Sequence, residues 1–271
     1  MNHKLDDKIT ACIVVHNEGE IVERCLKSIK EVTDNIIVVH DGPCSDDTLD
    51  ICISMGCSVF VRDHIGMCEG HRAWTYLQVK TSWILQIDAD EILTEDVSEN
   101  CQHLVNTSEV ACYEFLWPYW DGKTYRTQNW PYKKALFQKD KVQYLGFPHE
   151  EVRVNGIIKK VPFIIEHRPR YDNYSVKNFF RKHSKWIKIH ALYHLMDQGQ
   201  LDSYPKYCDD LSPHYSIIKA CPLLIAPILF CYHFIGLMVY GGAREGWYGL
   251  RNSFMQSLYY FLLCIEVFKK K

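Results

Sequence analysis

The sequence predicts an α/β fold with a mixed, mostly parallel sheet, flanking helices and a helical C-terminal region. Short apolar runs alternate with helical patterns through about residue 105, which is typical of βαβ units. Alternating polar and apolar residues come next, and a helical period returns after about residue 170. The 271-residue chain is 47% hydrophobic and 24% charged, so it can form a sizeable core.

The first part of the chain contains four expected strands, at residues 9–15, 35–39, 58–62 and 83–87. Three helices are expected between these strands: one that begins near Gly19, one over residues 45–55 and one over residues 69–80. Apolar residues on one face define the first helix: Ile21, Val22, Cys25, Leu26 and Ile29. Ligands of parallel sheets bind beyond the carboxyl ends of the strands. Three of these ends carry His16-Asn17, Asp41, and Asp88 with Asp90.

The middle of the chain is expected to be antiparallel or mixed. Residues 111–117 alternate like a strand, and Asp121-Gly122 is typical of a hairpin turn. Residues 153–158 predict a second hairpin. A helix is expected over 174–196, and one face of it carries four cations: Lys177, Arg181, Lys185 and Lys188. This basic face is either simply solvated or a binding surface for an anionic glycolipid.

Two C-terminal segments are suited to a membrane. No formally charged residue occurs between Lys219 and Arg244, a length that passes the threshold for a spanning helix. Because Pro222, Pro227 and Gly236 interrupt this stretch, we expect it to rest on or embed in a membrane rather than cross it. Residues 254–265 form an apolar face beside aromatic residues and a terminal lysine run, as in an interfacial anchor. Helices packed onto the domain or a partner are the alternative.

Composition excludes some functions. The formal net charge of −2 argues against a nucleic-acid binder, because no basic excess exists to displace counterions. The twelve cysteines contain no C-x-x-C pair, which argues against a zinc site or a disulfide framework. The first residues are polar and lack the apolar region of a signal peptide. We therefore expect a reducing, cytoplasmic compartment.

Asp88 and Asp90 follow an apolar run and are separated by one residue. Side chains two positions apart in extended backbone point the same way, so both carboxylates can reach one cation. Oxygen ligands of this kind suit Mg²⁺ or Mn²⁺. The alternative is an ordinary helix N-cap, with Glu91 in the first turn of the next helix.

Three motifs occur in one characteristic order: residues 13–18 (Ile-Val-Val-His-Asn-Glu), 36–48 (from Ile36 through His40-Asp41-Gly42 to Thr48) and 83–91 (Trp-Ile-Leu-Gln-Ile-Asp-Ala-Asp-Glu). Together they resemble the family 2 glycosyltransferases, which have the GT-A fold. More narrowly, the chain is similar to the bacterial lipopolysaccharide-core and cell-envelope glucosyltransferases. That likeness rests on Pro148-His149-Glu150 and on the Gly-rich aromatic segment 240–247.

The resemblance implies a nucleotide-sugar site at the strand ends. Asp41 matches the carboxylate that accepts a hydrogen bond from the base, and Arg72 matches an arginine that approaches the diphosphate. The full set implied is Val14, His16, Asn17, Asp41, Arg72 and Asp88. The family often has a second Asp where this chain has His40, and usually an aromatic residue where it has His16.

The resemblance also implies a metal site and a catalytic base. Asp88 and Asp90 match the residues that hold Mg²⁺ or Mn²⁺ on the diphosphate, and His167 is a further candidate ligand. Glu150 is the candidate base because it follows His149 in the matching motif, and Glu151 beside it is the alternative. A base is needed to take the proton from the attacking acceptor hydroxyl.

The sequence therefore predicts an inverting, metal-dependent glycosyltransferase. The expected donor is a nucleotide-diphosphate sugar, most commonly a UDP-sugar in this family, and the expected acceptor is a membrane-associated glycolipid or polysaccharide precursor. Residues 1–170 would form the catalytic domain, with donor half 1–105 and acceptor half 106–170, and residues 171–271 would place it on the inner face of the cell membrane. Two alternatives are a haloacid-dehalogenase-like phosphohydrolase with Asp88 as nucleophile, and a non-catalytic scaffold that binds nucleotide sugar.

Overall fold

The computed structural model describes residues 7–107, 109–120, 123–126, 132–144, 146, 148–149, 151–172, 175–196 and 213–271. These residues fall into two compact units. The first comprises the described residues within Met1–Trp120 and Pro131–Arg170. The second comprises those within Asp121–Trp130, Tyr171–Tyr204 and Asp209–Lys271.

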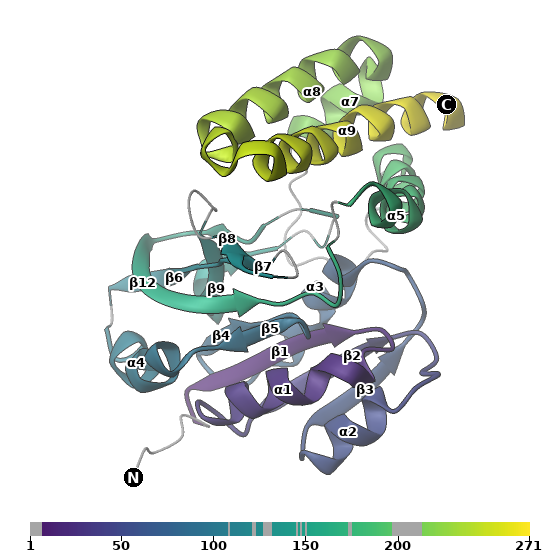
Figure 1. The fold of residues 1–271 in the computed structure, drawn as a ribbon. Helices are drawn as coiled ribbons and strands as arrows, with labels where there is room; N and C mark the ends of the chain where they lie inside the picture. Colours follow the sequence, from purple (N-terminus) through teal and green to yellow (C-terminus); the bar gives the residue numbers. More distant parts are fainter. Residues whose placement is uncertain are drawn as a thin grey trace. The chain divides into compact units, whose positions relative to one another are not determined.

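The first unit begins with a parallel sheet, as predicted. Its strands are β1 (Ile9–Val15), β2 (Ile36–Asp41), β3 (Ser58–Arg62) and β4 (Trp83–Gln86), and they lie in the order β3-β2-β1-β4. The connecting helices are α1 (Gly19–Lys30), α2 (Thr48–Ser54) and α3 (Cys68–Gln78) (Figure 1). Because these strands are parallel, their carboxyl ends lie at one edge of the sheet.

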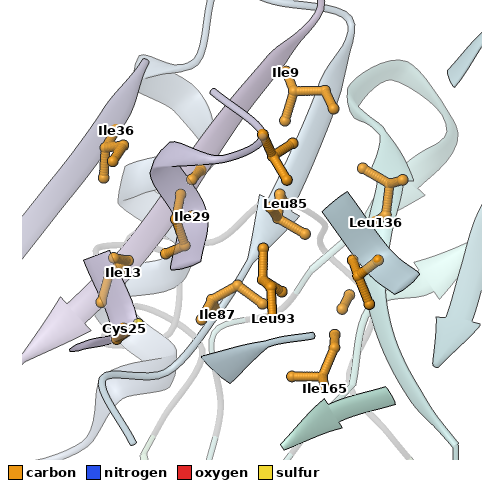
Figure 2. Packing of buried hydrophobic residues seen from close by; sticks show 14 of the residues in the cluster. Ile9, Ile13, Cys25, Ile29, Ile36, Leu85, Ile87, Leu93, Leu136 and Ile165 are labelled. Carbon is orange, nitrogen blue, oxygen red and sulfur yellow. The ribbon is translucent and has the colours of Figure 1, made fainter. Parts of the chain in front are cut away.

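Alternate residues of β1 enter two different cores. Ile9, Ala11 and Ile13 pack in the cluster that includes the apolar face of α1, and Figure 2 shows part of this packing. Cys12 faces the other side and packs in the cluster that includes Tyr76 of α3. All five predicted core residues of α1 are buried, which confirms the helical period seen in the sequence. Full burial of such an aliphatic side chain stabilises the fold by about 1.5–3 kcal/mol.

An antiparallel strand then changes the character of the sheet. Strand β9 (Lys133–Gln138) runs antiparallel to both β4 and β6 (Val110–Leu116). Strand β12 (Ile157–His167) lies parallel to β6 and also pairs with β7 (Tyr119–Trp120) and with β5 (Glu91–Leu93). Helix α4 (Glu95–Val105) follows β5, while η1 (Lys139–Lys141), β10 (Val142–Gln143) and β11 (Arg153–Val154) complete the unit. The mixed, mostly parallel sheet was thus correctly predicted.

One local prediction is wrong, and one alternative is not realised. Residues 153–158 do not form a hairpin, because β11 pairs with β10 whereas β12 pairs with β6. Gly156 has a φ of 145°, and a Cβ atom there would lie 2.7 Å from the Cβ of Ala111. Glycine therefore lets the chain approach β6 instead of folding back. The alternative for Asp88 and Asp90, a helix N-cap with Glu91 in the first turn, is not realised, since Glu91 begins β5 and α4 starts only at Glu95. The predicted turn at Asp121-Gly122 lies outside the described residues.

The second unit is mainly helical and contains α5 (Val176–Leu195), α7 (Pro213–Ala220), α8 (Pro222–Val239), η2 (Gly242–Glu245) and α9 (Gly246–Lys270), with the short β8 (Tyr125–Arg126). The Oγ atom of Ser175 caps α5 by accepting a hydrogen bond from the Asn178 N–H at 3.4 Å. Helices α8 and α9 pack side by side, with His233 stacked on Tyr260 at a ring separation of 4.0 Å (Figure 1). The backbone of Gly249 lies so close to η2 that a Cβ atom there would be 2.0 Å from the carbonyl oxygen of Gly242.

One face of α8 is apolar and exposed. Leu224, Tyr232 and Val239 are 69%, 70% and 80% exposed, and Ile228 and Ile235 lie on the same face at helical spacing. Among the described residues, Pro222–Val239 is the helix whose length and composition would allow it to cross a membrane, with a mean hydropathy of 2.0 and 11% of its residues buried. The surface of α5 differs, because its exposed residues include all four cations of the predicted basic face.

Candidate active site

The carboxyl ends of β1, β2 and β4 bring the predicted site residues to one edge of the sheet. His16 and Asn17 directly follow β1, Asp41 ends β2, and Asp88 lies two residues after β4. Parallel pairing of β1 with both neighbours aligns these three ends. The arrangement is the one in which open α/β sheets bind their ligands.

Asp41 accepts hydrogen bonds on both carboxylate oxygens from within the chain. The N–H groups of Ile65 and Gly66 donate to Oδ1 and Oδ2 at 2.7 and 2.9 Å, and His71 Nε2 donates to Oδ1 at 2.8 Å. His64 Nδ1 lies 3.0 Å from Oδ2. Burial would raise the pKa of Asp41, but the His71 hydrogen bond and the backbone donors outweigh burial and lower it below its ordinary 3.8. Asp41 is therefore held as a carboxylate.

Histidines replace the acidic and aromatic side chains that the family resemblance implies around Asp41. His40 is fully buried, and its Nδ1–H donates to the carbonyl of Gly42 at 2.7 Å while its Nε2 accepts the Asn17 N–H at 3.2 Å. This pair of bonds fixes a neutral imidazole in one tautomer. His16 is exposed and donates from Nδ1 to the Asp41 carbonyl at 2.6 Å. Val14 is partly buried against the cluster that includes α3.

Asn17 lies in the turn between β1 and α1. Its φ of 53° lies in the left-handed region, where Asn is one of the better-tolerated residues. Its Oδ1 atom accepts the Ser45 N–H at 2.8 Å. Asn17 therefore orders the loop after β2, in addition to any contact with a ligand.

Asp88 sits between two cations. Arg72 of α3 donates from Nη2 to Asp88 Oδ1, and Lys133 Nζ lies 3.2 Å from Oδ2. Burial would raise the pKa of Asp88, but the charges of Arg72 and Lys133 outweigh it and hold the pKa well below its usual range. The Nε of Arg72 is buried and has no hydrogen-bond partner among the described residues.

Lys133 and Trp117 belong to the site although sequence reasoning did not identify them. Lys133 Nζ donates to both carboxylate oxygens of Glu91, each at 2.6 Å, and Trp117 Nε1 donates to Oε1 at 2.6 Å. Glu91 is fully buried, and its Oε2 also accepts the Asp88 N–H at 2.8 Å. Burial, helped by the charge of Asp88, raises the pKa of Glu91 even though Lys133 acts in the opposite direction. For Lys133, the sequence offered one signal: two lysines directly before the apolar residues 135–137.

Asp90 lies beside the third candidate metal ligand. His167 Nε2 is 3.2 Å from Asp90 Oδ2, and the His167 ring stacks on Trp117 at a centroid distance of 4.3 Å. The two carboxylates are oxygen ligands of the kind that suits Mn²⁺ or Mg²⁺, and the imidazole would add one nitrogen ligand. In this structure the Asp88 carboxylate faces Arg72 and Lys133, whereas Asp90 faces His167. The chemistry of the donor set fits a divalent cation, with Asp90 and His167 as the preassembled part.

A cavity of about 280 Å³ opens beside Asp88, and neither Asp90 nor His167 is among its lining residues. Its wall contains Asp88, Arg72 and Lys133 together with other charged and aromatic side chains: Glu69, Gln86, Trp117, Tyr132, Lys134, Tyr144, His149, Glu151 and Val152. Arg72 and Lys133 are paired with Asp88 and Glu91 here, so an anionic ligand would have to take over their hydrogen bonds.

The two candidate bases are placed differently. Glu151 lines the cavity, is largely exposed and pairs with Lys134 at 2.8 Å. Glu150 lies outside the described residues, but His149 before it lines the cavity and has a φ of 62°. The buried Glu69 accepts the His149 N–H at 3.0 Å and fixes this backbone.

Comparison with known protein families identifies the chain. The family model described as glycosyl transferase family 2 matches residues 10–161, more than half of the sequence. The chain belongs to glycosyl transferase family 2. The matched region contains Asp41, Arg72, Asp88 and Lys133, and it ends before His167. This membership overturns the alternative of a haloacid-dehalogenase-like phosphohydrolase.

Curated relatives resemble the first part of this family 2 chain. An uncharacterized glycosyltransferase of Rickettsia conorii is 34% identical over 104 residues, which cover 38% of this chain and 36% of the relative. A second, from Rickettsia prowazekii, is 32% identical over 97 residues, 36% of this chain and 32% of the relative. The match therefore spans about a third of the length of each relative.

Solved structures show a more distant likeness to the family 2 chain. Staphylococcus aureus TarS is 11% identical, with 91% of this chain and 55% of TarS covered at a TM-score of 0.49. Glucosyl-3-phosphoglycerate synthase of Mycobacterium tuberculosis, in complex with phosphoglyceric acid, is 14% identical, with 69% and 79% covered at a TM-score of 0.48.

Proposed function

We propose that this chain is an inverting, metal-dependent glycosyltransferase. It moves a sugar from a nucleotide-diphosphate sugar to a membrane-associated glycolipid or polysaccharide precursor. The observation that carries the proposal is the Arg72–Asp88–Lys133 arrangement at the end of β4, in a cavity within the family-matched region. Two cations around one carboxylate can transfer their hydrogen bonds to an incoming diphosphate.

The proposed donor site extends from the carboxyl ends of β1 and β2 to the end of β4. Asp41 and His16 would receive the base, with Val14 and Asn17 beside them, and Arg72 would move from Asp88 to a phosphate oxygen. The freed Asp88 would then face the ribose and, with Asp90 and His167, hold Mg²⁺ or Mn²⁺. The cation would supply charge neutralisation of the departing diphosphate. A UDP-sugar is the proposed donor.

The proposed reaction is a single displacement. Glu150, or Glu151 next to it, takes the proton from an acceptor hydroxyl while that oxygen bonds to the anomeric carbon. The bond from this carbon to the diphosphate oxygen breaks at the same time, so the configuration inverts and the nucleotide diphosphate leaves. Lys134 would hold Glu151 in place until an acceptor arrives, because the two side chains are paired at 2.8 Å.

The membrane-associated acceptor is proposed from the second unit. The exposed apolar face of α8 and the lysines that end α9 suit a membrane interface. A cytoplasmic protein held on the inner face of the cell membrane would meet lipid-linked acceptors there. We assign this chain to cell-envelope glycan synthesis, as in the lipopolysaccharide-core branch.

A panel of nucleotide sugars, each with Mg²⁺ or Mn²⁺, tests the proposal through release of the nucleotide diphosphate. Wild-type chain should release nucleotide from one donor, and Asp90→Ala should lose at least about 100-fold of that rate because a metal ligand is missing. Asp140→Ala removes an exposed carboxylate outside the site and should behave like wild type. Donor binding without any release would favour the non-catalytic scaffold, and full activity of a folded Asp90→Ala variant would refute the metal assignment.

A further inference from the structure

His16, Asp41 and His64 bring four atoms that could bind a metal ion close together: two imidazole nitrogens and two oxygens of Asp41. His16 Nδ1 lies 2.6 Å from the Asp41 carbonyl oxygen, and His64 Nδ1 lies 3.0 Å from Oδ2 and 3.4 Å from that carbonyl. Ligand atoms of His16, Asp41 and His64 all lie within 4.8 Å of one another. Ligands around a tetrahedral ion at about 2.0–2.1 Å are about 3.3–3.4 Å apart, so small shifts would suffice to enclose an ion here.

The surroundings hold these donors in position. A Cβ atom on Gly42, whose φ is 85°, would lie 2.8 Å from the Cβ of His64. Only glycine therefore lets the His64 loop approach the end of β2 so closely. The carboxylate of Asp41 is oriented from behind by His71 and by the N–H groups of Ile65 and Gly66. Hydrogen bonds of this kind are what orient the ligands in known metal sites.

The donor types favour a transition metal over Mg²⁺. Two imidazole nitrogens and one carboxylate oxygen suit Zn²⁺ and Co²⁺, whereas Mg²⁺ prefers oxygen ligands throughout. His16 is exposed and the His64 side chain is 39% exposed, so an ion can enter from solvent. This site is separate from the Asp88, Asp90 and His167 donor set at the end of β4.

We propose that His16, Asp41 and His64 form a second metal site that binds Zn²⁺ or a chemically similar transition-metal ion. The ion replaces the protons that the two histidines share with Asp41. It also fixes His64 against the Asp41 carboxylate. On the proposed function, in which Asp41 receives the base, bound zinc and bound nucleotide therefore exclude each other.

Zinc binding is tested directly on the full chain, stripped of metal with a chelator and kept in excess Mg²⁺. Titration of Zn²⁺ against a chromophoric chelator should show a single tight site in the wild type. His64→Ala and His16→Ala should each weaken that site at least about tenfold, as loss of a ligand requires. His103→Ala, which removes an exposed histidine on α4, should leave it unchanged. Equal affinity of His64→Ala and wild type would overturn the site.

Co²⁺ spectra separate this site from the cysteines. A nitrogen- and oxygen-ligated ion lacks the intense thiolate-to-cobalt charge-transfer band, so that band would assign the binding to cysteine and reject the proposal. Mutual exclusion is measured separately, as the affinity for UDP with and without one equivalent of Zn²⁺. A loss of UDP affinity in wild type but not in His64→Ala is expected. Unchanged UDP affinity with zinc bound would refute the mutual exclusion. The metal site itself is decided separately, by the Zn²⁺ titration.

Discussion

Replacing Lys133 by Met removes the cation that joins two carboxylates in the first unit. Lys133 Nζ bonds both oxygens of Glu91 at 2.6 Å and reaches Asp88 Oδ2 at 3.2 Å. The Lys133 side chain is 15% exposed and that of Glu91 is fully buried. The substitution therefore leaves a buried carboxylate without its counter-charge.

The expected loss in the free energy of unfolding is about 3 kcal/mol. Removing one partner of a buried ion pair typically costs about 3–5 kcal/mol. The lower value applies because Trp117 Nε1 and the Asp88 N–H still donate to Glu91, and Arg72 still pairs with Asp88. The pKa of Glu91 is already raised, chiefly by burial, and it would rise further without Lys133. A raised carboxylate pKa costs stability above the folded value, so the deficit should shrink as the pH falls and Glu91 takes up a proton.

Urea denaturation followed by tryptophan fluorescence measures this loss, and a second substitution tests its cause. In Glu91→Gln/Lys133→Met both charges are gone, so the double variant should recover most of the stability lost by Lys133→Met alone. A cost of less than about 1 kcal/mol for Lys133→Met, the value typical of exposed pairs, would refute a buried ion pair at this position. Simple additivity of the two substitutions would refute it as well.

Three further predictions concern Asp41, the Gly242–Gly249 contact and α8. Asp41→Asn should cost about 1–3 kcal/mol, because an amide N–H₂ would face donors that now bond a carboxylate. Since the pKa of Asp41 is lowered from 3.8, the wild type should keep this contribution above about pH 4 and lose it as the pH falls through the folded value, and urea titrations of Asp41→Asn should lack that step. Gly249→Ala should lower the melting temperature, because its Cβ would overlap backbone atoms of Gly242 and such overpacking costs about 1–3 kcal/mol or more in the free energy of unfolding. Gly236→Ala is the control, since a Cβ there meets open space. Leu224→Asp should weaken co-sedimentation with lipid vesicles at least about tenfold, because one aliphatic side chain would no longer be buried in the lipid. Leu77→Asp on α3, which also replaces an exposed leucine, is the matched control. Equal binding by wild type and Leu224→Asp would contradict a membrane role for α8.

The parallel half of the fold was accessible from the sequence because each of its signals is local. An apolar strand followed by a polar end is visible without knowing the neighbours, as at Val15-His16 and Ile87-Asp88. Helix α1 was equally clear, since its buried face follows a 3.6-residue period. The same local logic brought Asp41, Asp88 and Asp90 into the candidate site, whereas Arg72 was predicted from the family resemblance alone.

Lys133 could not be found in this way because its place depends on pairing across the sheet. Antiparallel register aligns Leu85 with Leu136, and three further steps place Lys133 opposite Asp88. Sequence alone does not give that register. The hairpin predicted at 153–158 failed for a related reason: Asn155-Gly156 does form a bend, but the strands on either side choose different partners. His64 was missed because its loop can approach Asp41 only where Gly42 has no side chain, and that approach is a tertiary contact.

The change of direction between β4 and β9 also shapes how such a chain can diverge under selection. Because β9 runs opposite to β4, its first residue stands beside Asp88 although it is encoded 45 positions later. A single codon change at the start of β9 therefore alters the charge next to Asp88 without touching β1, β2 or β4. The charge of this site is thus set by two separate chain segments, one that carries Arg72 and Asp88 and one that carries Lys133.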